Sequence, residues 1–266
     1  MNITIIKIGG NVIDFPAKLE EFLQLFSKFP GKKILVHGGG ITATKFGESL
    51  GVMPEMVDGR RITDKETLDI VTMVYAGLIN KQIVAKLQSL RQNAAGMTGA
   101  DGNLIRSEKR PVKTIDYGYV GDIKEVNVEL LEGMLERKMV PVICAITHDK
   151  KGQLLNTNAD SIASELATNL SKKHKVNLYY CFNKAGVLID EHNDNSIIPL
   201  INEDIYTELK RENVIHSGMI PKLDNAFAAL NKGVNFVWIG KAENLLLAAK
   251  GKLSGTIIEK QRYELY

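Results

Sequence analysis

Short hydrophobic runs alternate along the chain with longer segments in which hydrophobic residues recur every three or four positions. The short runs predict buried strands at residues 3–8, 33–37, 140–146, 176–181 and 235–239. The periodic segments predict helices at residues 19–29, 38–50, 64–90, 126–137, 159–170, 203–213, 220–232 and 245–249. Weaker runs predict short strands and turns at residues 94–96, 104–106 and 117–121. Such alternation predicts an α/β protein with a mainly parallel sheet covered by helices on both faces.

The predicted helix at residues 64–90 has a defined start. Thr63 is a candidate N-cap, and Glu66 follows three residues later, as in a capping box. The ends of the predicted strands matter more for function, because ligands of open α/β sheets gather at the carboxyl ends of the strands.

Composition narrows the class of protein. The 266 residues are 44% hydrophobic and 24% charged, as in ordinary globular proteins, and can form one large domain or two lobes. The net charge of +3 gives no reason to expect nucleic acid or a membrane as partner. The first strand begins at once, and no run approaches the ~18 apolar residues of a membrane span, so we expect a cytoplasmic protein. Cys144 and Cys181 lie in hydrophobic runs without metal or redox spacing, which predicts buried free thiols.

Two glycine motifs follow predicted strands. The first reads Lys7-Ile8-Gly9-Gly10-Asn11, and the second reads His37-Gly38-Gly39-Gly40. Bare backbone before a helix presents amide N–H groups to a phosphate, although an ordinary tight turn with a surface lysine would also explain the first motif. The Walker pattern and the dinucleotide fingerprint are both absent, which argues against an NAD-dependent dehydrogenase. We expect His37 to be structural.

Three further motifs carry polar groups at predicted helix starts. They read Asp58-Gly59-Arg60-Arg61-Ile62-Thr63, Asn156-Thr157-Asn158-Ala159-Asp160 and Gly218-Met219-Ile220-Pro221-Lys222. An arginine of the first motif is suited to bind a substrate carboxylate. The alternative is that it belongs to a solvated basic turn. N-capping accounts for one polar residue of the second, not for all three. Lys222 would lie in the unfavourable field of a helix N-terminus and therefore calls for an anionic partner.

Taken in order, these five motifs resemble those of the amino acid kinase family, over residues 3 to about 258. Within the family they are most similar to the branch that phosphorylates N-acylated glutamate. The resemblance implies an open αβα sandwich with a carbamate kinase-like fold. It also implies an N-terminal lobe, residues 1–173, for the acyl amino acid and dimerisation, and a C-terminal lobe, residues 174–266, for ATP. The polar stretch at residues 171–175 marks the boundary.

The resemblance also implies roles for single residues. Lys7 and Lys222 match the two catalytic lysines, and Asp160 matches the aspartate that organises them. The residues that match acyl-glutamate contacts are Gly39, Gly40, Arg61, Asn156 and Asn158. Those expected around the ATP phosphates are Gly9, Gly10, Asn11, Gly38, Asn183, Gly186 and Lys222. We expect Mg²⁺ to be held by the ATP phosphates, with no metal ligands from the protein.

The expected reaction is ATP-dependent phosphorylation of the γ-carboxylate of N-acetyl-L-glutamate in arginine biosynthesis. The alternatives are a kinase of the same fold acting on N-succinyl-L-glutamate and a non-catalytic nucleotide or amino-acid sensor. The chain departs from the family at Asn183, where an aspartate is usual, and matches loosely over residues 97–121, a segment that contributes to the acyl pocket in relatives. Hexameric, arginine-inhibited relatives carry an extra N-terminal helix, so we expect a homodimer here.

Overall fold

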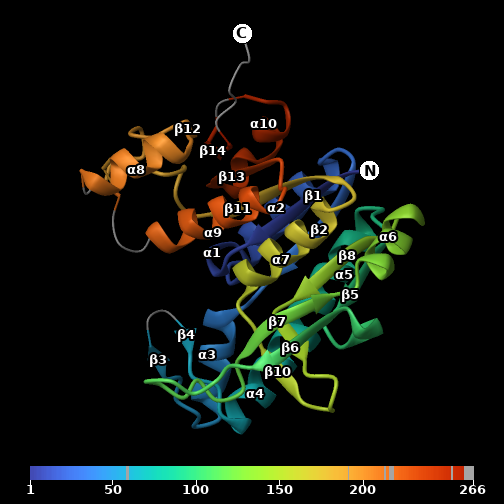
Figure 1. Ribbon diagram of the computed structural model, residues 1–266. Helices are drawn as coiled ribbons and strands as arrows, with labels where there is room; N and C mark the ends of the chain where they lie inside the picture. Colours follow the sequence, from blue (N-terminus) through green and yellow to red (C-terminus); the bar gives the residue numbers. More distant parts are fainter. Residues whose placement is uncertain (58–59, 191, 213, 216–218, 253, 261–266) are drawn as a thin grey trace.

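One eight-stranded sheet forms the centre of the protein, in the order β12-β14-β13-β11-β1-β2-β8-β5 (Figure 1). This computed structural model describes residues 1–57, 60–190, 192–212, 214–215, 219–252 and 254–260. The strands are β1 (Asn2–Ile8), β2 (Lys32–His37), β5 (Ala94–Met97), β8 (Val140–Cys144), β11 (Lys175–Phe182), β12 (Leu200–Ile201), β13 (Phe236–Lys241) and β14 (Thr256–Ile258). The six strands from β13 to β5 run parallel, and β14 pairs antiparallel with β13. The predicted α/β class with a mainly parallel sheet is confirmed.

Helices cover both faces of this sheet. One layer contains α6 (Val128–Glu136), α7 (Ala159–Ser171) and α9 (Ile220–Asn231), and the other contains α2 (Pro16–Lys28), α5 (Asn80–Ser89) and α10 (Leu245–Ala249). The remaining helices are α1 (Gly10–Ile13), α3 (Gly40–Ser49), α4 (Lys65–Thr72), α8 (Glu203–Arg211) and the short 3-10 turns η2 (Asp101–Asn103) and η3 (Ala242–Asn244).

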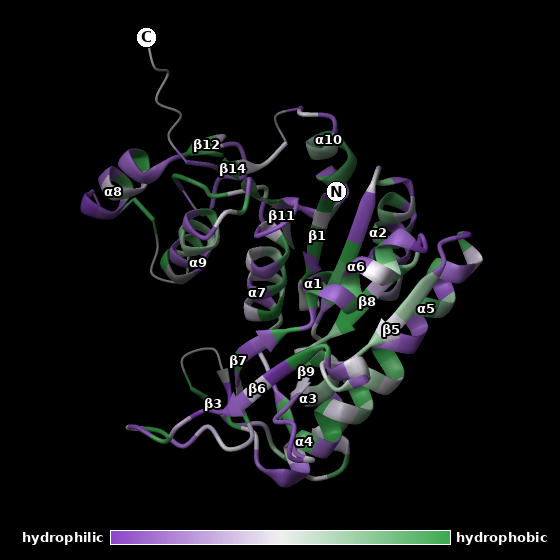
Figure 2. Cartoon of the chain, turned by 45° about the vertical axis from the view of Figure 1, so that its right-hand side comes forward, coloured by the Kyte–Doolittle hydropathy of each residue, from purple (hydrophilic) through white to green (hydrophobic). Residues whose placement is uncertain are grey.

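The core lies between the sheet and the two helical layers. In β1, residues 3–8 are all buried, because a strand covered on both faces keeps no solvent side. Figure 2 shows hydrophobic residues concentrated on β1 and the neighbouring strands, whereas the outlying α8 is largely hydrophilic. Cys144 and Cys181 are buried free thiols, as predicted, and burial raises the pKa of each to about 12.

Two small sheets lie beside the central one. A four-stranded sheet has the order β10-β9-β6-β7 and consists of β6 (Ile105–Lys109), β7 (Gly121–Val126), β9 (Ile146–His148) and β10 (Leu154–Asn156). A two-stranded hairpin joins β3 (Met56–Val57) and β4 (Arg60–Arg61). The predicted single strand at residues 140–146 was wrong, because the chain leaves the central sheet at Ala145 and enters the small one as β9. The pattern did not separate the two because Val140–Cys144 and Ile146 are all buried.

The helical stretch from Lys65 to Ser89 is continuous, but its middle is a π-helix, η1 (Met73–Ile79). Its N-cap is Asp64, whose Oδ1 accepts from the backbone N–H of Thr67 at 2.7 Å, so the predicted Thr63 cap was wrong. Thr63 is instead buried and pairs with Tyr117 and Tyr119 through its backbone. Within the described residues this is the one helix long and apolar enough to cross a membrane, and it packs Val71, Ile83 and other side chains into the core.

The turn after α7 covers residues 172–174, where the lobe boundary is predicted. The central sheet is continuous across it, since β1 pairs with β11 over seven residue pairs. This pairing aligns the carboxyl ends of two strands that are far apart in the sequence.

Candidate active site

Lys7, Asp160 and Lys222 meet at the carboxyl edge of the central sheet. The Nζ of Lys7 lies 2.7 Å from Oδ1 of Asp160, with both side chains mostly buried. The same Nζ lies 5.4 Å from the ring centre of Phe182, and the Nζ of Lys222 lies 4.1 Å from it. The ring of Phe182 therefore lies near two cations from opposite ends of the chain, and the carboxylate of Asp160 pairs with one of them, Lys7.

Strand register explains why these groups converge. Ile8 is paired with Cys181, so β1 and β11 end side by side, and the N–H of Gly9 donates to the carbonyl of Cys181 at 3.3 Å. Phe182 is the last residue of β11. Asp160 reaches the same edge from the first turn of α7, where the Oδ1 of Asn158 caps the helix by accepting from the N–H groups of Asp160 and Ser161.

The electrostatic state of Lys222 depends on this cluster. Burial lowers its pKa below the usual value, the nearby Lys7 lowers it further, and the charge of Asp160 raises it. Lys222 also lies in the first turn of α9, where the helix dipole opposes a cation. Asp160 is therefore the anionic partner that the sequence called for. Gly218, at the start of this motif, lies outside the described residues.

The second glycine motif forms the loop between β2 and α3. Gly39 has φ of 150°, and a Cβ there would overlap Cδ1 of Ile79 and lie 3.1 Å from Cδ1 of Tyr75. Only glycine fits so close to the π-helix. The loop therefore presents bare backbone, without side chains, to the neighbouring cavity.

His37, the residue directly before this loop, is fully buried and supports the loop through a hydrogen bond. Asn80 donates its amide N–H to Nε2 of His37 at 3.0 Å, so Nδ1 carries the proton and donates to the carbonyl of Gly38 at 2.9 Å. Burial lowers the pKa of His37 to about 4, which keeps the ring neutral. The expected structural role of His37 is confirmed.

A cavity of about 350 Å³ opens beside the loop. All five residues predicted to bind the acyl amino acid line it, together with Gly38: they are Gly39, Gly40, Arg61, Asn156 and Asn158. Arg61 comes from β4 and donates through Nη2 to the carbonyl of Gly40 at 3.0 Å and to Oγ1 of Thr44 at 2.8 Å. Asn156 donates to Oγ1 of Thr63 at 3.0 Å, which leaves its amide oxygen for other partners. Asp58 and Gly59, which precede this arginine, lie outside the described residues.

The residues expected around ATP are more dispersed. Asn11 and Asn183 line a second cavity of about 220 Å³ with Phe182 and Lys241. Gly9 lies close to Lys7, since a Cβ there would be 3.9 Å from Nζ, and Gly10 packs against Asp14. Gly186 packs against β14, where a Cβ would lie 2.7 Å from Oγ1 of Thr256, and this contact alone explains the glycine.

Three groups of the site were missed at the sequence level. The ring of Phe182 lies near both lysines, and Tyr75 of η1 lines the substrate cavity. Arg110 and Asp122 form part of the wall of the same cavity. Phe182 follows the strongest predicted strand, so its place at the sheet edge was a usable signal. Tyr75 gave no such signal, because helical periodicity assigns it to the core. The Arg110–Asp122 pair gave no signal either, because a loop position assigns it to the surface.

Comparisons with known proteins concern the family and the fold of the whole chain. The profile of the Amino acid kinase family matches residues 2–241. The protein named acetylglutamate kinase of Cytophaga hutchinsonii is 55% identical over 95% of this chain and 96% of its own length. The protein of the same name from Phocaeicola vulgatus is 50% identical over 97% of this chain and 98% of its own. Carbamate kinase from Giardia lamblia, solved with AMP-PNP, has a TM-score of 0.70 at 15% identity, over 97% of this chain and 98% of its own, which concerns the fold alone.

Proposed function

The chain belongs to the amino acid kinase family, and we propose that it phosphorylates the γ-carboxylate of N-acetyl-L-glutamate with ATP. The product is N-acetyl-L-glutamyl 5-phosphate, an intermediate of arginine biosynthesis. Relatives at 50 to 55% identity that are named acetylglutamate kinase support this assignment. The observation that carries it is the pair of lysines that share Asp160 and Phe182 beside a cavity lined by glycines.

The chemistry needs charge neutralisation and alignment and does not need a base. A γ-carboxylate with a pKa near ~4.3 is already a nucleophile at neutral pH. During transfer, negative charge spreads over the oxygens of the phosphoryl group, and nearby fixed cations and amide N–H groups stabilise it. Lys7 and Lys222 supply the cations, and the loop from Gly38 to Gly40 supplies backbone amides.

The remaining groups orient the substrates. We assign the α-carboxylate to Arg61, which lines the cavity and whose Nη2 is anchored by Gly40 and Thr44. We assign the acylated amino group to Asn156 and Asn158. Asp160 acts through the lysines, because its carboxylate pairs with Lys7 and raises the pKa of Lys222 against the lowering effect of burial.

Mg²⁺ enters this scheme with the nucleotide. Across the part of the chain that the structure describes, no three His, Cys, Asp or Glu side chains gather to hold a metal ion. The carboxylate of Asp160 is already paired with Lys7. This residue set fits an ion bound by ATP phosphates, where it would neutralise phosphate charge.

We further propose that the protein acts as a cytoplasmic homodimer through its N-terminal lobe, residues 1–173, with ATP on residues 174–266. Phe46 on α3 and Leu50 at the C-cap of this helix are exposed, and α3 packs beside η1, which exposes Met73 and Leu78. Hydrophobic residues gathered in this way favour contact with a second copy. Light scattering of the purified protein tests the dimer.

The activity is tested by ADP release from MgATP with N-acetyl-L-glutamate, L-glutamate and L-aspartate offered in parallel. Trapping with hydroxylamine identifies the acyl phosphate. Turnover restricted to the acylated substrate is expected, because Asn156, Asn158 and the cavity wall have no role with a free amine. Absence of turnover with all three would move the assignment to the sensor or to a kinase with another acceptor.

A further inference from the structure

Asp14 connects the two glycine motifs of the site. It is the C-cap of α1, the short helix that follows Gly9, and its backbone N–H donates to the carbonyl of Gly10 at 2.8 Å. Its carboxylate oxygen Oδ1 accepts from the backbone N–H of Thr42 on α3 at 3.0 Å and from the Thr42 hydroxyl at 2.5 Å. Asp14 is therefore bound to the first motif through its backbone and to the helix of the second motif through its side chain.

The first turn of α3 needs a cap from outside the helix. Its N-cap residue is Gly39, which has no side chain to accept from the free N–H groups of this turn. A capping residue does not fit there, because a Cβ on Gly39 would overlap Ile79. The carboxylate of Asp14 supplies the missing acceptor to the third residue of the helix, and an anion is favoured at this end of a helix.

The carboxylate of Asp14 does more than a cap requires. A Cβ on Gly10 would lie 2.8 Å from its second oxygen, Oδ2, so the carboxylate leaves no room for a side chain at Gly10. Oδ2 is buried and has no hydrogen-bond partner among the residues that the structure describes. A buried carboxylate oxygen without a partner is unfavourable, and an amide or a hydroxyl could cap α3 without it. Local stability alone therefore does not explain the carboxylate.

The two segments that Asp14 connects hold opposite sides of the proposed reaction. On the phosphoryl side, Gly9 lies two residues after Lys7, and its N–H is bound to the end of β11. On the acceptor side, Gly40 and Thr44 of α3 anchor the guanidinium of Arg61. A shift of α3 relative to α1 would therefore move the groups assigned to the acyl amino acid away from those assigned to the phosphoryl group.

Building on the kinase activity proposed above, we propose that Asp14 is a positioning residue for phosphoryl transfer. Its carboxylate fixes α3 to α1 and so sets the distance between the acceptor carboxylate and the transferred group. The rate depends steeply on this distance, since a misplacement of about 1 Å can cost about 100-fold. Asp14 touches neither substrate in this account, so its loss lowers kcat and leaves both KM values nearly unchanged.

Removal of the carboxylate tests this role directly. Asp14→Ala should lower kcat with N-acetyl-L-glutamate by about 10- to 100-fold, with the KM values for ATP and for the acyl amino acid within about threefold of the wild type. Asp14→Asn keeps one acceptor oxygen for Thr42 and should therefore retain more activity than Asp14→Ala. Such partial rescue by the conservative variant is expected of a positioning hydrogen bond.

Thr42 offers a milder change that does not depend on the folding of Asp14→Ala. Thr42→Val removes the hydroxyl and keeps the backbone N–H, so one of the two hydrogen bonds remains and kcat should fall about 3- to 10-fold. Thr42→Ser keeps the hydroxyl and should stay within about twofold of the wild type. In the double variant Asp14→Ala/Thr42→Val the two losses should not add, because both changes remove the same connection.

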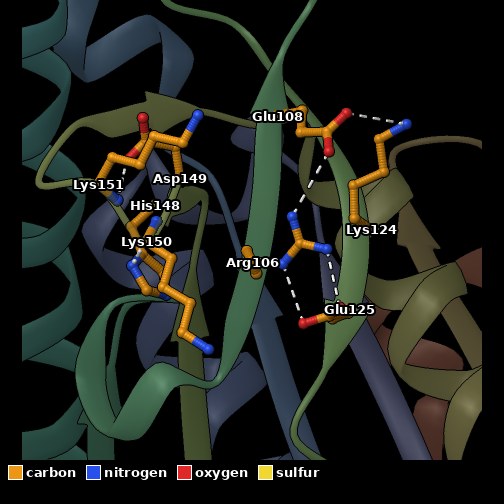
Figure 3. A network of polar contacts seen from close by, with 8 residues as sticks. All are labelled: Arg106, Glu108, Lys124, Glu125, His148, Asp149, Lys150 and Lys151. Atoms are coloured by element: carbon orange, nitrogen blue, oxygen red, sulfur yellow. Dashed lines mark hydrogen bonds and ion pairs between the residues drawn. The ribbon is translucent and has the colours of Figure 1, made fainter.

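The matched control is Asp149, a carboxylate that caps backbone N–H groups within the hairpin between β9 and β10 (Figure 3). Its Oδ1 accepts from the N–H of Lys151 at 2.7 Å and from the N–H of Gln153 at 3.0 Å. Asp149 is not among the residues that line the substrate cavity. Asp149→Ala should therefore lower the melting temperature and leave kcat unchanged in assays well below that temperature.

Each outcome decides one of the two proposals. If kcat stays within about twofold of the wild type in both Asp14→Ala and Thr42→Val, the connection only stabilises the fold, and this inference is overturned while the kinase assignment stands. A raised KM with an unchanged kcat would also overturn it, because Asp14 would then act in binding. If the wild-type protein does not phosphorylate the acyl-glutamate, the kinase assignment fails and the inference fails with it.

Discussion

Replacing Asp160 by Asn removes the negative charge that pairs with Lys7 and raises the pKa of Lys222. Oδ1 of Asp160 is 2.7 Å from Nζ of Lys7, and its charge raises the pKa of Lys222 against burial and against Lys7. The amide keeps the shape of the carboxylate and one acceptor oxygen, and it removes the charge. The change therefore isolates charge, and it should affect turnover more than folding.

The size of the effect follows from the geometry. Two unit charges about 4 Å apart attract by about 4 kcal/mol at an effective dielectric constant of about 20. The carboxylate is 25% exposed, and solvent screens part of that attraction. A loss of about 2 to 3 kcal/mol of transition-state stabilisation corresponds to a decrease in kcat of about 30- to 150-fold.

The pH dependence of kcat provides a second measurement. Lys222 must be protonated to neutralise phosphate charge, so kcat falls as pH rises through its pKa. In Asp160→Asn the raising influence on that pKa is lost, while the lowering influences of burial and Lys7 remain. The alkaline limb of the profile should therefore shift to lower pH than in the wild type.

A matched control is Asp69→Asn, which breaks the exposed pair between Lys65 and Asp69 on α4. Exposed pairs of this kind contribute little, and both kcat and the pH profile should stay as in the wild type. A kcat for Asp160→Asn within threefold of the wild type, with the alkaline limb in place, would refute the role assigned to the carboxylate.

Three further predictions concern the supports of the site. Phe182→Leu removes the ring under both lysines and should lower kcat about 2- to 30-fold, whereas Phe182→Tyr should remain close to wild type; equal rates for the two would contradict a cation–π role. Gly39→Ala should lower the free energy of unfolding by about 2 kcal/mol or more, because its Cβ meets Ile79, while Gly77→Ala, in open space, should not destabilise; thermal melts compare the two. Burial lowers the pKa of His37 to about 4, so the unfolded chain takes up its proton first as pH falls. Stability should therefore decline by about 3 kcal/mol between pH 6.5 and 4, and a His37→Gln variant that keeps the same decline in urea titrations would show that another group is responsible.

The hydrophobic pattern alone was enough to predict the layered α/β fold and most of its helices. Strands such as residues 3–8 and 176–181 are buried on both faces and therefore read as unbroken hydrophobic runs. Short strands with one exposed face were harder, because β6 and β7 expose residues such as Glu108 and Lys124. The predicted strands and turns at residues 104–106 and 117–121 therefore covered only the start of each strand. The π-helix left no signal, since its extra residue per turn changes the hydrophobic spacing only slightly.

The chemistry of single residues could also be predicted from the sequence, because the type of a residue limits what it can do. This holds for the glycines, Lys7, Arg61, Asp160 and Lys222. Their assembly was not, because it depends on which strands become neighbours. The placement of β11 beside β1 brings Phe182 to the edge where Lys7 ends, and α9 then carries Lys222 to the same ring. In the same way, the pairing of β7 with β6 brings Asp122 to Arg110 at the wall of the cavity. Local sequence determines what each group is, and long-range packing, which minimises exposed apolar surface over the whole chain, decides what it faces.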